Sequence, residues 1–166
     1  HGGHLDQSVK MPAPEYIYAV ARVLIGKRML GRGAGALGIW SAKGSQEYGI
    51  LSREDAEKLG YHYSGKLSDK WGWEGPPRDA IEAANPFRVK TIAQITNAKD
   101  ACDSLHNGYP ITVASTQGFD GGSYDEDGKR WLRARGSWPH QMAIIGMENR
   151  PGRKAGFFIM NSWGPD

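Results

Sequence analysis

Short apolar runs bounded by a turn are clearest in the C-terminal part of the chain. Two short apolar runs, 140–147 and 157–161, flank the turn sequence Arg150-Pro151-Gly152-Arg153. Runs of this length, separated by a turn containing proline and glycine, are typical of paired strands. The pattern therefore predicts an antiparallel hairpin, and the apolar run Ile111–Ala114 predicts a further short, buried strand.

The N-terminal part has a less regular pattern. Residues 1–15 are polar and interrupted by proline, which favours an extended lead-in. Residues 16–25 are rich in β-branched and aromatic side chains and favour a strand, with a helix as the alternative. The glycines between Gly31 and Gly38 then predict a flexible loop.

Capping and stop signals predict four helices in the middle of the chain. Ser52 and Asn97 are preferred N-cap residues, and acids follow each of them. Gly49 and the pair Asn107-Gly108 are typical stop signals. The helices that we expect are 39–48, a short one after Ser52, 78–84 and 97–105.

Three further segments complete the pattern. Residues 60–77 contain Trp71 and Trp73, and we expect an irregular loop packed by aromatic side chains. Residues 87–95 alternate well enough for a strand, and 117–137 predict a long loop rich in Gly, Asp and Arg. Because the helices lie mostly early and the strands mostly late, the sequence predicts an α+β fold.

Composition narrows the class of protein. The chain has 166 residues, 39% of them hydrophobic, which predicts one domain or two small lobes that share a cleft. The net charge is +3 and the basic residues are scattered among acids, so nothing predicts nucleic-acid binding. The densest basic run, Arg130, Arg133 and Arg135, is interpreted as a solvated face. No apolar stretch approaches the ~20 residues of a membrane span.

The sequence predicts neither a cofactor nor a metal site. The single cysteine, Cys102, excludes an internal disulfide and therefore indicates no compartment. It lies within a predicted helix beside acids, so a buried structural role is preferred to a reactive one. His1 and His4 supply only two ligands, and the spacing of a calcium loop is missing from Asp120, Asp125, Glu126 and Asp127.

His140 and Asn161 are the main candidates for chemistry. His140 opens the first strand of the predicted hairpin and Asn161 closes the second, 21 residues later (161 − 140). A hairpin of this size can bring both side chains to the same end of the sheet. An imidazole serves as general base and acid in thiol proteases, and a third polar group fixes its tautomer.

Together, the sequences from His140 to Gly146 and from Asn161 to Gly164 resemble the C-terminal half of the papain-like cysteine peptidases. The resemblance implies that His140 is the general base, that Asn161 orients it, and that Trp163 shields their hydrogen bond. It also implies a papain-like two-lobed fold, one domain over residues 1–166, with a central helix packed against an antiparallel β-sheet. The chain is expected to be a fragment of a longer protein.

Weaker matches extend this resemblance upstream. The sequence Gly108–Val113 resembles the strand that precedes the substrate loop of the family, which implies that Phe119 lies near the cleft. The sequence Gly38–Ile50 resembles the central helix, and the family carries its nucleophilic cysteine at the start of that helix. Matching the pair Ser41-Ala42 puts the nucleophile at Leu37, and a slip of one residue puts it at Ala36.

The sequence departs from the family where the nucleophile is expected. Neither Leu37 nor Ala36 can attack a carbonyl carbon, and the glutamine that helps to form the oxyanion hole falls on Gly31. Ser41 lies one turn into the expected helix, away from that position, and is a weaker candidate for a replacement nucleophile.

The preferred interpretation is a catalytically inactive pseudopeptidase. It would bind a peptide or protein in its cleft, or serve as a structural module among neighbouring subunits of a larger assembly. The alternative is an active thiol peptidase whose nucleophile, at 36 or 37, has been replaced in this chain. A third interpretation is a small α+β binding module with an accidental motif match, in which His140 is a satisfied core histidine and Asn161 a turn residue.

Overall fold

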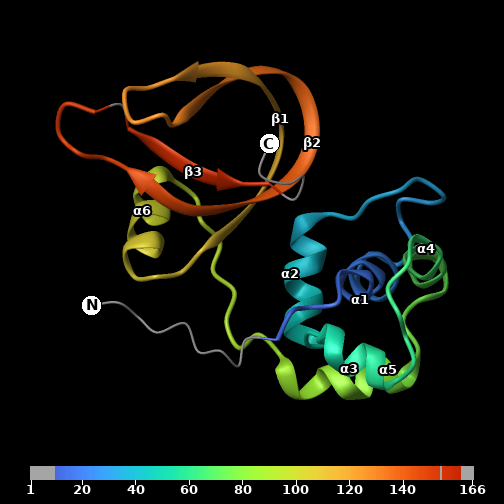
Figure 1. The fold of residues 1–166 in the computed structure, drawn as a ribbon. Helices are drawn as coiled ribbons and strands as arrows, with labels where there is room; N and C mark the ends of the chain where they lie inside the picture. The colour runs from blue at the N-terminus through green and yellow to red at the C-terminus, as the bar shows by residue number, and fades with distance from the viewer. Residues whose placement is uncertain (1–9, 154, 162–166) are drawn as a thin grey trace. The chain divides into compact units, whose positions relative to one another are not determined.

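The computed structural model describes residues 10–153 and 155–161. The chain divides into two compact units, residues 1–93 (unit 1) and 94–166 (unit 2). Helices form unit 1, and an antiparallel sheet with one helix forms unit 2 (Figure 1). This combination of elements confirms the predicted α+β class.

Unit 1 begins with two consecutive helical segments, α1 (Pro14–Ala19) and the π-helix η1 (Val20–Ile25). They pack against two later helices, α2 (Gly38–Glu47) and α4 (Gly65–Glu74). The remaining elements are α3 (Arg53–Lys58), α5 (Arg78–Ala84) and the short 3-10 helix η2 (Asn85–Phe87). The buried core of the unit consists of Ala13, Tyr16, Ala19, Val20, Leu51, Ala56, Trp71, Ala80 and Ala84.

The strand expected at residues 16–25 is wrong, and the extended lead-in already ends before Pro14. The helix begins at Pro14, whose fixed φ angle suits the first helical position. Tyr16, Ala19 and Val20 are all buried, and they recur at the spacing of one helix face. The β-branched composition favoured a strand, but burial of this face against the other helices outweighs that propensity.

A buried ion pair joins α1 to α3. Glu15 is 1% exposed and accepts two hydrogen bonds from Arg53, at 2.6 Å from Nη1 and 3.0 Å from Nη2. The backbone supports the same junction, because the Ala13 N–H donates to the Leu51 carbonyl at 2.8 Å and the Arg53 N–H donates to the Met11 carbonyl at 2.7 Å. The Glu15 carboxylate is therefore paired with Arg53, and backbone hydrogen bonds hold the two segments together around it.

The predicted caps place most of the helices correctly. Ser52 Oγ accepts the amide of the third residue after it at 3.0 Å, and Asn97 Oδ1 does the same at 2.9 Å. Gly49, at φ +82, ends α2, and a Cβ there would lie 2.0 Å from the Ala84 carbonyl oxygen. Only glycine fits this turn.

The irregular loop expected at 60–77 is a helix over most of its length. Ser64 caps α4 by accepting a backbone N–H from the first turn at 3.1 Å. The aromatic packing that we expected is present, because buried Trp71 lies edge to face on Tyr61 with ring centroids 5.0 Å apart. Glycines within the segment lower its helix propensity, which explains why the pattern did not indicate a helix.

Unit 2 contains α6 (Ala98–His106) and three strands, β1 (Ile111–Tyr124), β2 (Arg130–Glu148) and β3 (Gly156–Met160). The strand order is β1-β2-β3 and both pairs are antiparallel. Ala143 pairs with Met160, which confirms the predicted C-terminal hairpin. Strands β1 and β2 form a second, longer hairpin that curves back on itself (Figure 1).

Most of the loop expected at 117–137 belongs to the paired strands of this longer hairpin. A Cβ at Gly122 would lie 1.4 Å from the Trp131 carbonyl oxygen, so the glycine lets the two backbones approach closely. Register shifts along the pair add irregularities of the β-bulge type. The glycine content favoured a loop, whereas in the folded sheet it permits close strand packing.

The strand expected at 87–95 is also wrong. Phe87 ends η2, and residues 88–96 form neither helix nor strand. The backbone of this segment bonds to the region of α2 instead, because the Val89 N–H donates to the Ser45 carbonyl at 3.1 Å. These hydrogen bonds replace those of a sheet.

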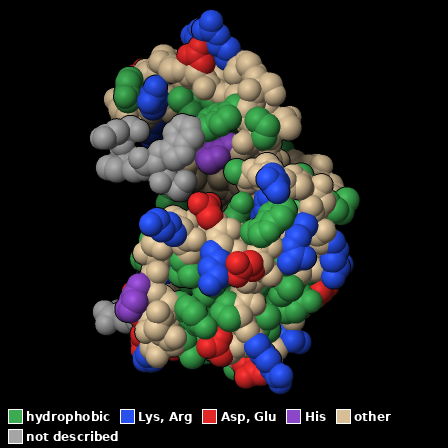
Figure 2. Space-filling view, turned by 90° about the vertical axis from the view of Figure 1, so that its right-hand side faces the viewer, with side chains coloured by type: hydrophobic (Ala, Val, Ile, Leu, Met, Phe, Trp, Pro, Cys, Tyr) green, Lys and Arg blue, Asp and Glu red, His purple; other side chains and the backbone are tan. Residues whose placement is uncertain are grey.

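The surface mixes charged and apolar side chains. On the face drawn in Figure 2, Lys and Arg side chains are interspersed with Asp, Glu and hydrophobic ones. Among the helices of the described residues, none is both long enough and apolar enough to cross a membrane.

Candidate functional site

The sheet of unit 2 brings His140 and Asn161 together. Asn161 follows the last residue of β3, and the pairing of β3 with β2 places it beside the segment that carries His140. The His140 Nε2 and Asn161 Oδ1 atoms lie 3.0 Å apart. His140 does not open its strand, as the sequence suggested, because β2 begins at Arg130.

The contact defines the tautomer of the imidazole. An amide oxygen only accepts hydrogen bonds, so Nε2 carries the hydrogen and donates it to Asn161. In the neutral ring, Nδ1 is then the basic nitrogen. An imidazole held in one tautomer by a neighbouring polar group is the arrangement that general-base chemistry uses.

Trp138, which was not among the predicted site residues, covers one face of the imidazole. Its ring is stacked on that of His140, with centroids 4.8 Å apart and planes 7° apart. The signal in the sequence was the spacing, because residues two apart on a strand share a face. The other aromatic candidate, Trp163, lies outside the described residues.

Ser115 is a second residue beside His140 that was not among the predicted site residues. It is the register partner of His140 across β1 and β2, so both side chains project from the same face of the sheet. Ser115 Oγ accepts the Gln117 N–H at 2.9 Å. Further along the same face, Val113 pairs with Met142, which is buried. This face therefore carries Ser115 opposite His140, with the apolar pair Val113 and Met142 next to them.

Phe119, which the resemblance places near the cleft, belongs to β1 of unit 2. It pairs with Ala134 in the long hairpin and is half-buried. It lies four positions beyond Ser115 (119 − 115), roughly 13 Å along a strand.

The residues expected at the nucleophile position lie in unit 1. Leu37 is the N-cap residue of α2, and its carbonyl accepts the N–H groups of Trp40 at 2.9 Å and Ser41 at 3.2 Å. Its side chain is 47% exposed and carries no polar atom, and Ala36 before it is half-buried. The structure therefore confirms a helix start at this position, with an apolar residue on it.

Gly31, the position expected to supply an oxyanion donor, has φ +57 and no side chain. Its carbonyl accepts a hydrogen bond from Arg22 Nη2 at 2.6 Å, and the Gly35 carbonyl accepts one from Nη1 at 2.8 Å. The glycine-rich loop is thus fixed to η1 by a single guanidinium.

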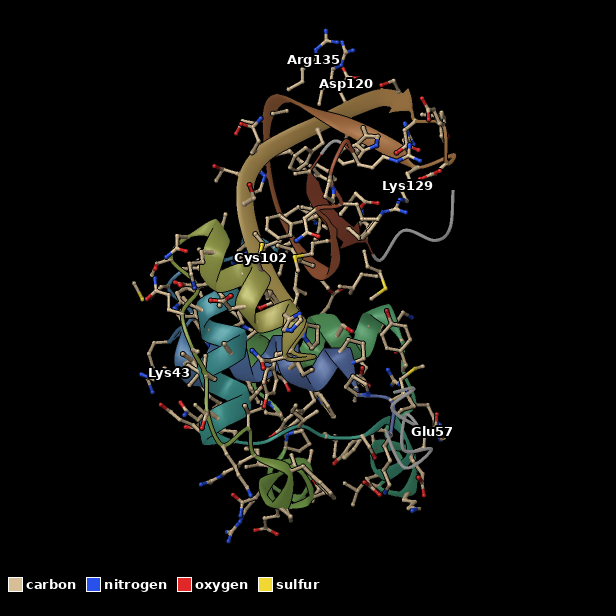
Figure 3. All side chains as sticks on the ribbon, turned by 90° about the vertical axis from the view of Figure 1, so that its left-hand side faces the viewer. Lys43, Glu57, Cys102, Asp120, Lys129 and Arg135 are labelled. Atoms are coloured by element: carbon tan, nitrogen blue, oxygen red, sulfur yellow. The ribbon has the colours of Figure 1, made fainter. Side chains whose placement is uncertain are left out.

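Cys102 and the acidic turn lie elsewhere in unit 2. Cys102 is half-buried on α6 (Figure 3). Asp125 accepts the Trp131 indole N–H at 2.7 Å and the Lys129 amide at 2.9 Å, and these bonds hold the pKa of Asp125 below its usual value. Asp127 forms ion pairs with Arg150 and other cations. The carboxylates of this turn are therefore engaged within the protein.

A metal-binding cluster of three or more His, Cys, Asp or Glu residues does not occur among residues 10–153 and 155–161. His1 and His4 lie outside the described residues. Within the long hairpin, Asp120 of β1 forms an ion pair with Arg135 of β2 (Figure 3). Arg135, the last residue of the basic run Arg130, Arg133 and Arg135, therefore forms an ion pair across the two strands.

Comparison with known proteins gives no relative: no family model, no curated protein and no solved structure matches the chain. Function is therefore inferred from the motif and the geometry of the site.

Proposed function

We propose that the chain is a papain-like pseudopeptidase that binds a peptide or protein segment without cleaving it. In this proposal the two units are the lobes of a papain-like fold, and the His140–Asn161 pair is the remnant of a catalytic centre. The observation that supports it is the 3.0 Å contact between the imidazole and the carboxamide at the positions that match the family motifs.

The missing nucleophile favours binding over catalysis. Covalent catalysis requires a thiol or hydroxyl that the imidazole can deprotonate, and Leu37 and Ala36 offer neither. Gly31 has no side-chain donor for a developing oxyanion, and loss of one such donor costs on the order of 10²–10³ in rate. A site with both changes would bind a peptide bond without stabilising its transition state.

The remaining groups suit peptide recognition. An imidazole with a defined tautomer presents a hydrogen-bond acceptor, and the stacked Trp138 ring limits the directions that the imidazole can take. An acceptor fixed in this way can accept a hydrogen bond from a backbone N–H of an extended peptide segment. The partner is a peptide, a flexible segment of another protein, or a neighbouring subunit of an assembly.

A second candidate function is an active thiol peptidase whose nucleophile has been replaced in this chain. The specific observation that favours it is the tautomer, since the Nε2–H···Oδ1 bond leaves Nδ1 as the basic nitrogen. Restoring a thiol distinguishes an inherited catalytic geometry from an accidental motif match.

The experiment uses single cysteines in a Cys102→Ser background. Ala36→Cys and Leu37→Cys are each labelled with a neutral thiol-reactive probe at pH 7, with and without His140→Ala. The matched control is Ile39→Cys, on the same helix and 67% exposed. We expect one of the two cysteines to react about ten times faster than the control, because the proposed arrangement puts an imidazole beside the thiol, and such an imidazole favours the thiolate. His140→Ala should abolish that difference.

Two results would contradict the proposal. If both cysteines react like the Ile39→Cys control, irrespective of His140, the papain-like arrangement is wrong. If the unaltered chain hydrolyses peptides and His140→Ala removes that activity, the arrangement is right but the protein is an enzyme and not a pseudopeptidase.

A further inference from the structure

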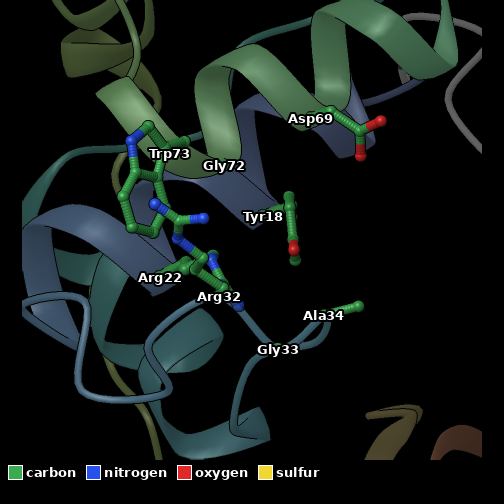
Figure 4. Close-up of a pocket in the computed structure, with 8 residues that line it drawn as sticks. All are labelled: Tyr18, Arg22, Arg32, Gly33, Ala34, Asp69, Gly72 and Trp73. Atoms are coloured by element: carbon green, nitrogen blue, oxygen red, sulfur yellow. The ribbon is translucent and has the colours of Figure 1, made fainter.

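Unit 1 contains a cavity that the His140–Asn161 pair does not share. Its volume is about 360 Å³, within the range of small-ligand sites. Residues from η1 and its neighbour α1, from the glycine-rich loop and from α4 form its walls (Figure 4). The lining residues are Tyr18, Arg22, Arg32, Gly33, Ala34, Asp69, Gly72 and Trp73.

Arg22 gives this cavity a buried positive charge. Only 4% of the residue is exposed, and Nη2 and Nη1 donate hydrogen bonds to the carbonyl groups of Gly31 and Gly35. Across the described residues, no carboxylate lies within ion-pair distance of it. Buried charges are normally paired with an opposite charge. The guanidinium is therefore solvated by carbonyl dipoles and keeps an uncompensated charge at the wall of the cavity.

Arg32 and Asp69 carry two further charges, and neither charge is compensated by another described residue. Neither side chain forms a hydrogen bond or an ion pair with any other described residue. Asp69 stands apart from the two arginines, across the space that the lining residues surround (Figure 4). The arginine side of the cavity is thus positive, and a single carboxylate lies on the other side.

The aromatic walls are held in place by close packing. A Cβ at Gly72 would lie 2.3 Å from Tyr18 Cε1, so the tyrosine ring lies directly against the backbone of α4. The Trp73 carbonyl accepts a hydrogen bond from Arg28 Nε at 2.8 Å, which fixes the end of that helix. The Arg22 guanidinium lies 5.9 Å from the Tyr18 ring centroid. A flat apolar group of a ligand in this cavity would therefore contact an aromatic surface that is already in place.

We infer that this cavity binds a carboxylate attached to an aromatic or similarly flat group. Guanidinium groups match carboxylate geometry, and two of them on one wall attract an anion. Asp69 repels a second negative charge, which disfavours a phosphate dianion. The inference does not depend on the proposed pseudopeptidase function, since the lining residues are all in unit 1 and the His140–Asn161 pair is in unit 2.

Two matched probes test the carboxylate. N-acetyltyrosine and N-acetyltyrosinamide differ only in that group, and titration calorimetry with the whole chain gives both dissociation constants. We expect the acid to bind about ten times more tightly than the amide, because a hydrogen bond to a charged group is worth more than one to a neutral group. Arg32→Gln should remove most of this difference. Arg78→Gln, at an exposed side chain of the same unit, should leave it unchanged.

Asp69→Asn tests the selectivity between anions. Inorganic phosphate should bind more weakly than N-acetyltyrosine to the unaltered chain. Asp69→Asn should reduce the difference between the two dissociation constants. A short peptide that ends in tyrosine, with and without C-terminal amidation, distinguishes the two sources of the carboxylate. If the chain binds the peptide with a free C-terminus more tightly than the amidated peptide, the natural ligand is a peptide C-terminus. If it prefers the acid over the amide only for N-acetyltyrosine, the ligand is a free aromatic acid.

Clear outcomes overturn the inference. Equal affinities for the acid and the amide exclude carboxylate recognition. An acid preference that is unchanged in Arg32→Gln contradicts recognition of the carboxylate by the two guanidinium groups together. Binding of phosphate more tightly than N-acetyltyrosine by the unaltered chain excludes the assigned role of Asp69. Arg32 and Asp69 are both exposed in the structure, so neither substitution should prevent folding.

Discussion

Replacing Arg53 by Met should destabilise unit 1 by about 3 kcal/mol. The change keeps the aliphatic part of the side chain and removes the guanidinium that donates two hydrogen bonds to Glu15. The Glu15 side chain is 0% exposed, so its carboxylate would lose both donors without gaining water. Breaking a buried pair in this way costs about 3–5 kcal/mol. The Arg53 side chain is 21% exposed, which favours the lower end of the range.

The measurement is urea denaturation followed by far-ultraviolet circular dichroism, which reports the helices of unit 1. The midpoint for Arg53→Met should fall while the slope stays constant. The double variant Glu15→Gln with Arg53→Met should recover part of the loss, because it removes the unpaired charge. Arg78→Met breaks the exposed pair with Glu82 and should change stability by less than about 0.5 kcal/mol.

Two results would refute this reasoning. A loss below about 1 kcal/mol for Arg53→Met is the value of an exposed ion pair and would mean that water reaches Glu15. A double variant no more stable than Arg53→Met would mean that the cost comes from lost packing, for example from the Arg53 contact with the Tyr63 ring at 4.9 Å, and not from an unpaired carboxylate.

Three further predictions concern particular side chains. Gly122→Ala should separate β1 from β2, because its Cβ would meet the Trp131 carbonyl, and amide exchange along both strands should accelerate. Burial raises the pKa of Tyr16 to about 12, so the unfolded chain loses that proton first; the free energy of unfolding should fall between pH ~10 and ~12, and Tyr16→Phe should remove the slope. The Arg150 side chain holds the pKa of Glu148 far below its usual value, so this stabilisation is complete above pH ~4.5 and is lost as the pH falls further; Glu148→Gln should flatten that acid limb in a thermal-melt series.

Local signals in the sequence predicted the parts of the fold that depend on near neighbours. The caps at Ser52 and Asn97 need only the next turn of backbone, and the C-terminal hairpin needs only its own turn and two apolar runs. The segments whose structure was predicted wrongly depend on partners far away in the sequence. Residues 16–25 are helical because that face is buried against later helices, and residues 117–137 pair because glycines admit the opposite strand.

The same distinction applies to the sites. His140 and Asn161 were found because the register of one hairpin brings them together. Trp138 could have been found from its two-residue spacing to His140, whereas Ser115 required the register of a second strand pair. The unit 1 cavity gave no sequence signal, because its walls come from three segments that only the packing of helices joins.

The His140–Asn161 contact does not by itself argue for enzymatic activity. Its geometry comes from the pairing of β2 with β3 and from the stacked Trp138, and all of these lie in unit 2. Leu37 and Ala36 belong to unit 1 and are not part of that hairpin, so the strand pairing that holds the imidazole does not require a cysteine at either position. The same His–Asn contact can therefore form in a protein without the nucleophile. For this reason the reactivity of a cysteine at 36 or 37 is the decisive observable, and the presence of the His–Asn pair is not.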